Sequence, residues 1–250
     1  GIIHGSNDFT ILRKQQKGTI SFIKSTGVYL SLMLLCIISY LINSYLAILF
    51  FIVLSSYHFG EQHLENKITG KKFVKSFIYI LYGLLIFSLI FIVNMNDVDT
   101  IMLNLTGTLI PKVWINMLLL FSSSMMLILY GYQRLKKIAF NFNIIRELFY
   151  VFLLYLVFKT SSLILGFAIY FVLWHSIPSI LDQTKFLWGD KTKKSLLNYF
   201  KTAFVYWIIS IVGLLVAYYY LTENLFSSVI FLVLFAVTAP HVWVMNRMKK

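Results

Sequence analysis

Five histidines are the residues of this chain best suited to chemistry, and four of them share a pattern. His58, His175 and His241 each fall near the end of a long apolar segment, and the charge pattern predicts that these ends share one side of a membrane. His4 precedes the first basic segment on that side. Ionisable side chains at membrane depth are costly and usually face a bundle interior, and neutral imidazole is the commonest metal ligand. These four histidines are therefore predicted to form one metal site near the cytoplasmic side; the alternative is that each caps a helix end or bonds a carbonyl.

The fifth histidine, His63, is expected to lie apart from this set. It follows His58 by five residues, which on an α-helix turns it about 140° away from the face of His58. Glu61 and Gln62, three and four residues after His58, are better placed beside it. Metal-bound imidazoles usually donate their second N–H to a carboxylate or carbonyl, so Glu61 is a candidate for such an outer contact.

Three more residues are candidates for contacts behind the histidines. Asp8 lies four residues after His4, and Asp182 lies seven residues after His175. Either carboxylate would reach its histidine if the local chain is helical, and the alternative for both is an ordinary helix-end charge. Ser179, four residues after His175, could also hydrogen-bond within the site, although the proline before it changes the local direction of the chain.

A site made only of neutral imidazoles leaves a divalent metal its full charge. Nitrogen donors without carboxylates suit iron, zinc or copper and disfavour magnesium or calcium. The residue types do not choose among the three metals. Cys36 is the only cysteine, which excludes an intramolecular disulfide and a cysteine-rich metal site.

The composition decides which elements must position these side chains. Hydrophobic residues make up 59% of the 250 residues and charged residues only 12%, against about 25% charged in an average soluble domain. Mean hydropathy is +0.81. These values exclude a water-soluble enzyme, a DNA-binding domain and a secreted disulfide scaffold. The net charge of +13 is explained by Lys and Arg that flank membrane spans, so no nucleic-acid partner is expected.

The sequence predicts an all-α, polytopic membrane protein with about eight helices in one domain over residues 1–250. A helix needs about 20 apolar residues to cross the hydrocarbon core. Two of the candidate spans are short, Tyr45–Tyr57 and Glu147–Phe158. We expect the first of these to continue toward Leu64 and the second to start near Asn143. The candidate spans are Ile20–Ile42, Tyr45–Tyr57, Phe73–Val93, Val113–Tyr130, Glu147–Phe158, Ser161–Ile177, Leu196–Leu221 and Leu225–Val244.

Basic residues follow this span count closely. When the connecting segments are assigned alternately to the two sides, all of the 22 Lys and Arg residues except Lys112 and Lys159 fall on one side. The positive-inside rule makes that side cytoplasmic. We therefore expect both visible termini in the cytoplasm and the inner (plasma) membrane of a bacterium as the location. Because the chain starts at Gly1 without a methionine, part of a preceding helix is expected to be missing.

Four short strings around the histidines carry a resemblance to a known family. In order, spacing and membrane context they resemble the Brp/Blh family of integral-membrane β-carotene 15,15′-dioxygenases over nearly the whole chain. The strings are Gly1-Ile2-Ile3-His4-Gly5-Ser6-Asn7-Asp8, Ser56-Tyr57-His58-Phe59-Gly60, Trp174-His175-Ser176-Ile177-Pro178 and Pro240-His241.

The resemblance implies an Fe(II)-dependent enzyme that splits β-carotene with dioxygen at its central double bond into two molecules of retinal. It also implies that His4, His58 and His175 are iron ligands, with His241 as the candidate for a fourth. Members of the family often carry a second histidine where this chain has Ser179. If that histidine is a ligand elsewhere, this chain must use His241 or His63 in its place or lack a full site.

Two other interpretations stay open at the level of sequence. A membrane transporter or a carotenoid-binding protein could carry structural histidines, although the span interiors hold almost no Asp, Glu, Lys or Arg. The second open interpretation is haem ligation by paired histidines. A di-iron hydroxylase is excluded, because it needs about eight ligands and five histidines are too few. Partners expected for an enzyme of this kind are the lipid bilayer, β-carotene, dioxygen and a retinal-binding rhodopsin as consumer of the product.

Overall fold

The computed structural model describes residues 2–16, 18–135 and 143–249, and every regular element within these ranges is a helix. This confirms the all-α prediction. Among the basic residues used to orient the spans, Lys17, Lys136, Lys137 and Lys250 lie outside the described residues.

Seven described helices are long and apolar enough to cross a membrane. Their positions match seven of the predicted spans, which makes the chain a multi-pass membrane protein by helix length and composition. The remaining predicted span, Glu147–Phe158, corresponds to α8 (Ile144–Thr160), whose 17 residues stand at the lower limit of about 17 for a crossing. The seven are α3 (Thr19–Ile42), α4 (Ser44–Leu64), α5 (Lys72–Val93), α7 (Lys112–Leu135), the run of α9 (Leu163–Tyr170), η1 (Phe171–Ser176) and α10 (Ile177–Trp188), α11 (Lys193–Tyr220) and α12 (Glu223–Met248).

The division between α3 and α4 depends on Asn43. Its backbone is extended, and its side-chain oxygen accepts a hydrogen bond of 3.0 Å from the amide of Leu46. An Asn side chain in this position satisfies an amide that the first turn of a helix leaves without an intrahelical acceptor. The predicted break at this point is therefore confirmed, as is the continuation of the second span to Leu64.

Three helices occur where the sequence predicts only connecting segments: α1 (Ile2–Gly5), α2 (Asp8–Gln15) and α6 (Met95–Thr106). Helix α6 is followed directly by Gly107, whose φ of 68° lies in the left-handed region that glycine adopts without a steric penalty.

The chain divides into two compact units, which we describe separately. Unit 1 comprises residues 1–48 and 176–250, and unit 2 comprises residues 49–175. The chain passes from one to the other inside α4 and at the end of η1. The expectation of a single domain stays a prediction.

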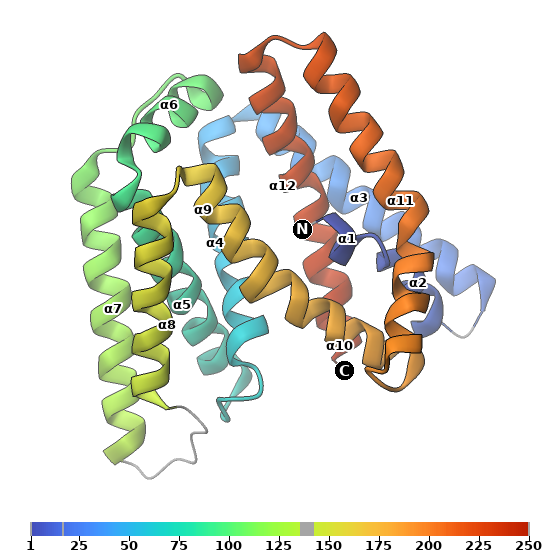
Figure 1. The fold of residues 1–250 in the computed structure, drawn as a ribbon, viewed down its shortest axis with the longest axis horizontal. Coiled ribbons are helices and arrows are strands. Elements are labelled where there is room, and N and C mark those ends of the chain that lie inside the picture. The colour runs from blue at the N-terminus through green and yellow to red at the C-terminus, as the bar shows by residue number, and fades with distance from the viewer. Residues whose placement is uncertain (1, 17, 136–142, 250) are drawn as a thin grey trace. The chain divides into compact units, whose positions relative to one another are not determined.

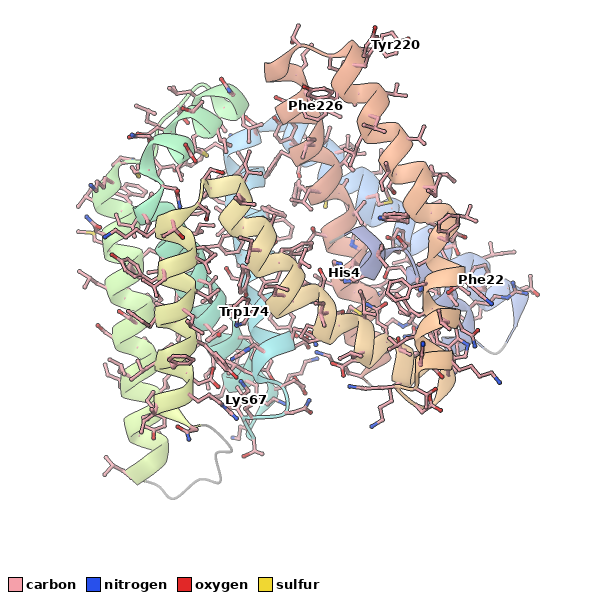
Figure 2. The ribbon with its side chains drawn as sticks, viewed as in Figure 1. His4, Phe22, Lys67, Trp174, Tyr220 and Phe226 are labelled. Atoms are coloured by element: carbon pink, nitrogen blue, oxygen red, sulfur yellow. The ribbon has the colours of Figure 1, made fainter. Side chains whose placement is uncertain are left out.

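In unit 1, α12 packs along α3, and the N-terminal α1 lies against α11 (Figure 1). Apolar side chains from α2, α3, α10, α11 and α12 form the core of this unit. It consists of Ile11, Leu12, Tyr29, Leu187, Tyr199, Ala203, Val244 and Met245. Figure 2 shows His4 well away from Tyr220 and Phe226, which mark the two sides of the α11–α12 connection.

In unit 2, α5 packs against both α7 and α8 (Figure 1). Helix α4 approaches α5 closely at two glycines. A Cβ atom on Gly60 would overlap the main chain of Tyr79, and a Cβ atom on Gly83 would overlap the main chain of Ser56. Small residues let two membrane helices come into backbone contact, and Ser56 and Gly60 flank His58 in the sequence.

Candidate functional site

Unit 1 contains a pair of buried histidines. His4 comes from α1 and His241 from α12, and both side chains are buried. Their ring centroids lie 4.7 Å apart, with the rings nearly perpendicular. The fold thus brings into contact two of the histidines that the sequence selected, although they come from opposite ends of the chain.

Asp8 holds one ring of this pair. Its carboxylate lies 2.8 Å from Nδ1 of His241 and also accepts a hydrogen bond of 3.1 Å from the Tyr29 hydroxyl. Because a carboxylate accepts, Nδ1 of His241 carries the proton, and Nε2 is the nitrogen suited to binding a metal. The sequence predicts Asp8 as an outer contact through its spacing from His4; in the structure, its carboxylate contacts His241.

Polar residues also surround His4. Ser176 places its hydroxyl 3.4 Å from Nδ1 of His4. The main-chain carbonyl of His4 accepts a 2.9 Å hydrogen bond from Nε2 of Gln183, and the Tyr199 hydroxyl lies 3.2 Å from the same oxygen. Gln183, Tyr199 and Tyr29 were not predicted, because the residues that they contact at His4 and Asp8 lie far away in the sequence.

Unit 2 contains the second pair of buried histidines. His58 comes from α4 and His175 from η1, and their ring centroids also lie 4.7 Å apart. Aromatic rings line this pair: Phe59 lies 4.7 Å from the ring of His175, and Phe171 stacks against it at 5.2 Å. These contacts make the surroundings of His175 apolar.

A proline lies beside one histidine of each pair. Pro178 has no amide hydrogen to donate to the carbonyl of Trp174, which the α-helical pattern would require. The helix widens there into the π-helical turn η1, which contains His175. Pro240 lies inside α12 and directly precedes His241. Both histidines therefore occupy places where the regular α-helical bonding is interrupted, a frequent property of functional sites in helices.

The other predicted outer contacts fall into two classes. Glu61 and Ser179 are buried: Glu61 accepts a 3.1 Å hydrogen bond from the Tyr57 hydroxyl, and Ser179 accepts one of 3.0 Å from Gln183. Asp182, by contrast, has a side chain 44% exposed and forms an ion pair with Lys191 at 2.9 Å. The outer role of these residues stays a prediction.

His63 belongs to a separate polar cluster in unit 2. Its Nε2 lies 2.6 Å from Glu147, and its ring stacks on Tyr82 at 4.7 Å. Lys67 donates to the same carboxylate at 2.8 Å. Burial lowers the pKa of the Lys67 ammonium, and its hydrogen bond to Glu147 opposes that shift. We call His63, Lys67 and Glu147 the α4–α8 cluster.

The donor set fits a transition metal. The four histidines of the two pairs are buried, and each offers a ring nitrogen that could bind a metal ion. Neutral imidazoles of this kind suit iron, zinc or copper.

Comparison with known proteins decides the family. A family model described as beta-carotene 15,15′-dioxygenase matches residues 1–249. The chain belongs to the β-carotene 15,15′-dioxygenase family. This confirms the resemblance carried by the four short strings, and it supports a dioxygenase activity on β-carotene in a membrane environment. No curated protein and no solved structure gives a significant match.

Proposed function

We propose that this protein cleaves β-carotene at the 15,15′ double bond and releases two molecules of retinal. One molecule of dioxygen is consumed, and each carbon of the broken double bond receives one oxygen atom as an aldehyde, so no other oxidant or reductant is needed. The reaction would take place at Fe(II) held by the four histidines of the two pairs. The observation that carries this proposal is the presence of the two buried pairs in a chain that its family model covers almost completely.

A covalent link supports the union of the two pairs in one site. His175 belongs to the pair of unit 2, and the next residue, Ser176, has its hydroxyl 3.4 Å from the ring of His4 in unit 1. Successive Cα atoms are 3.8 Å apart. His175 therefore directly precedes a residue that contacts His4, and on this continuity of the chain we propose one common metal.

The side chains around this site would orient the ligands and exclude water. Asp8 fixes the ring of His241 through Nδ1 and directs Nε2 away from the carboxylate. Phe59 and Phe171 cover the ring of His175 with apolar surface. Iron held by the neutral nitrogens of these histidines would supply the activation of dioxygen. An apolar shell around such a metal limits the access of water.

The substrate fits the composition of the protein. β-Carotene is a hydrocarbon that dissolves in the bilayer, so it offers no group for a charged side chain to bind. Apolar residues dominate the exposed faces of the long helices, such as Leu41 and Ile209, which are 73% and 64% exposed. We infer that the substrate enters from the lipid.

We also propose a location and a partner for this protein. The distribution of basic residues supports a cytoplasmic position for both visible termini, and we propose the inner membrane of a bacterium as the location. Retinal is an apolar aldehyde that would stay in the membrane, so a retinal-binding rhodopsin is a suitable consumer of the product.

The test is production of retinal in a bacterial host that accumulates β-carotene. We expect loss of carotene together with about two retinal molecules per carotene, and neither change with His58→Ala. The matched control is His63→Gln, which changes a histidine of the same helix that lies in the α4–α8 cluster; it should retain activity. Full activity in His58→Ala would refute the site. Unchanged carotene despite good membrane expression would favour a carotenoid-binding protein that does not cleave.

A further inference from the structure

The carbonyl groups at the C-terminal end of helix α1 need hydrogen-bond donors from outside the helix. The last carbonyl groups of a helix have no intrahelical donor and need other partners. Helix α1 ends at Gly5, so the carbonyls of Ile3 and His4 belong to this class. The main-chain amide of Ser6 donates a hydrogen bond of 3.2 Å to the carbonyl of Ile3. The carbonyl of His4, by contrast, accepts from side chains of distant helices.

Gln183 of α10 supplies one of these donors. Its side-chain amide donates to the carbonyl of His4 at 2.9 Å and to the hydroxyl of Ser179 at 3.0 Å. The residue is fully buried. Both hydrogens of the amide are therefore used, which fixes the side chain between its own helix and α1.

Tyr199 of α11 holds the same segment from a second helix. Its hydroxyl lies 2.9 Å from the side-chain oxygen of Gln183 and 3.2 Å from each of the carbonyls of Ile3 and His4. Its main-chain carbonyl accepts a 3.1 Å hydrogen bond from the side chain of Asn7. The single hydroxyl hydrogen of Tyr199 thus lies within reach of three acceptors, two of them in α1. The bond from Asn7 holds the chain on the other side of His4, and Tyr199 is fully buried.

We propose that Gln183 and Tyr199 form a hydrogen-bonded clamp on the main chain at His4 and act as positioning residues for its imidazole. The inference rests on the proposed metal site, to which His4 belongs. Neither residue needs to touch the metal, because both act on the main-chain carbonyl of the ligand residue. A leucine or phenylalanine would fill the same volume without polar atoms, and burying a polar group is unfavourable unless it is hydrogen-bonded.

The clamp predicts a defect in metal binding that is separable from a defect in folding. Tyr199→Phe removes one oxygen, and Gln183→Met replaces the amide with an apolar chain of similar length. We expect each to weaken binding of Co(II) to the metal-free protein in detergent about 10- to 100-fold, the usual loss when an outer partner of a ligand is removed. The d–d absorption bands of Co(II) report the affinity. Hydrogen exchange of the peptide that covers residues 1–8 should be faster in the metal-free variants.

A matched control lies on the same helix as Gln183. Thr184 is buried, and its hydroxyl donates only within α10, to the carbonyl of Ile180 at 2.7 Å. Thr184→Val therefore removes a buried hydroxyl without touching α1, and its Co(II) affinity should equal that of the unsubstituted protein. If Gln183→Met does not fold, Tyr199→Phe still provides the measurement.

The outcomes separate the two proposals. Failure of the unsubstituted protein to bind Co(II) would refute the metal site and the clamp with it. Normal Co(II) binding by both clamp variants would refute the clamp alone. A lower unfolding temperature with unchanged affinity would also refute the clamp, because it would assign Gln183 and Tyr199 to folding only.

Discussion

Nδ1 of His241 lies 2.8 Å from the carboxylate of Asp8, although 233 residues separate them in the sequence. The contact joins α2 to α12 within unit 1. It also determines the chemistry of the imidazole, because the proton on Nδ1 leaves Nε2 as the metal-binding nitrogen. The same carboxylate accepts from Tyr29, so its own orientation is fixed from a third helix.

Replacement of Asp8 should weaken the metal site without removing a ligand. Asp8→Asn keeps the shape and one acceptor oxygen but removes the charge that makes the imidazole a stronger base. We expect about 10-fold weaker iron binding for Asp8→Asn and a larger loss, up to about 100-fold, for Asp8→Ala. Iron per protein after dialysis against a weak chelator measures this. Equal iron content in all three proteins would show that Asp8 does not support the site.

Gly60 and Gly83 should not tolerate even a methyl group. A Cβ atom at either position would overlap main-chain atoms of the neighbouring helix, so α4 and α5 would have to separate, at a cost of about 1–3 kcal/mol. Thermal unfolding of Gly60→Ala in detergent should show this loss. Gly27→Ala in α3 is the control, because nothing lies within 4 Å of the added atom and alanine is the better helix former. A normal unfolding temperature for Gly60→Ala would contradict the close approach.

The sequence predicted the helices well because their signal is local. Long apolar segments, an Asn at position 43 and alternating basic connections are all visible over short stretches of chain. Short polar helices such as α6 lack that signal, since the segment between α5 and α7 contains Asp97 and Asp99 and resembles a loop. The 17-residue length of α8 likewise depends on where its caps fall.

The candidate site was predictable in its histidines and not in what surrounds them. A histidine in an apolar segment is conspicuous because its burial is unfavourable without a partner. Gln183 and Tyr199 are common residue types whose importance comes only from contacts across long sequence separations. Asp8 was predicted as an outer contact, but with His4 as its expected partner. Its actual partner is His241, and that contact depends on how α12 packs against α2.

Glu147 should contribute to stability because its negative charge neutralises Lys67 within the α4–α8 cluster. Its carboxylate is 5% exposed and contacts both His63 and Lys67. Glu147→Ala would leave Lys67 partly buried without its counter-charge, and we expect a loss of roughly 1–3 kcal/mol, smaller than for a fully buried pair. Arg146→Ala is the control: its side chain is 47% exposed and 3.8 Å from the same carboxylate, so the loss should be about 0–1 kcal/mol. Similar unfolding free energies in both variants would argue against the cluster.

Removal of the metal should lower stability by an amount that depends on free metal concentration. A ligand that binds only the folded protein stabilises it by about 2.7 kcal/mol at 100 times its Kd. We therefore expect a strong chelator to lower the unfolding temperature, and both Fe(II) and Zn(II) to restore it, since imidazole donors accept either metal. Only Fe(II) should restore retinal formation, because zinc does not change its oxidation state. His175→Ala should unfold at the same temperature with and without chelator. A chelator effect that persists in this variant would place the stabilising metal elsewhere in the protein, and the absence of any effect in the unsubstituted protein would refute a metal at these histidines.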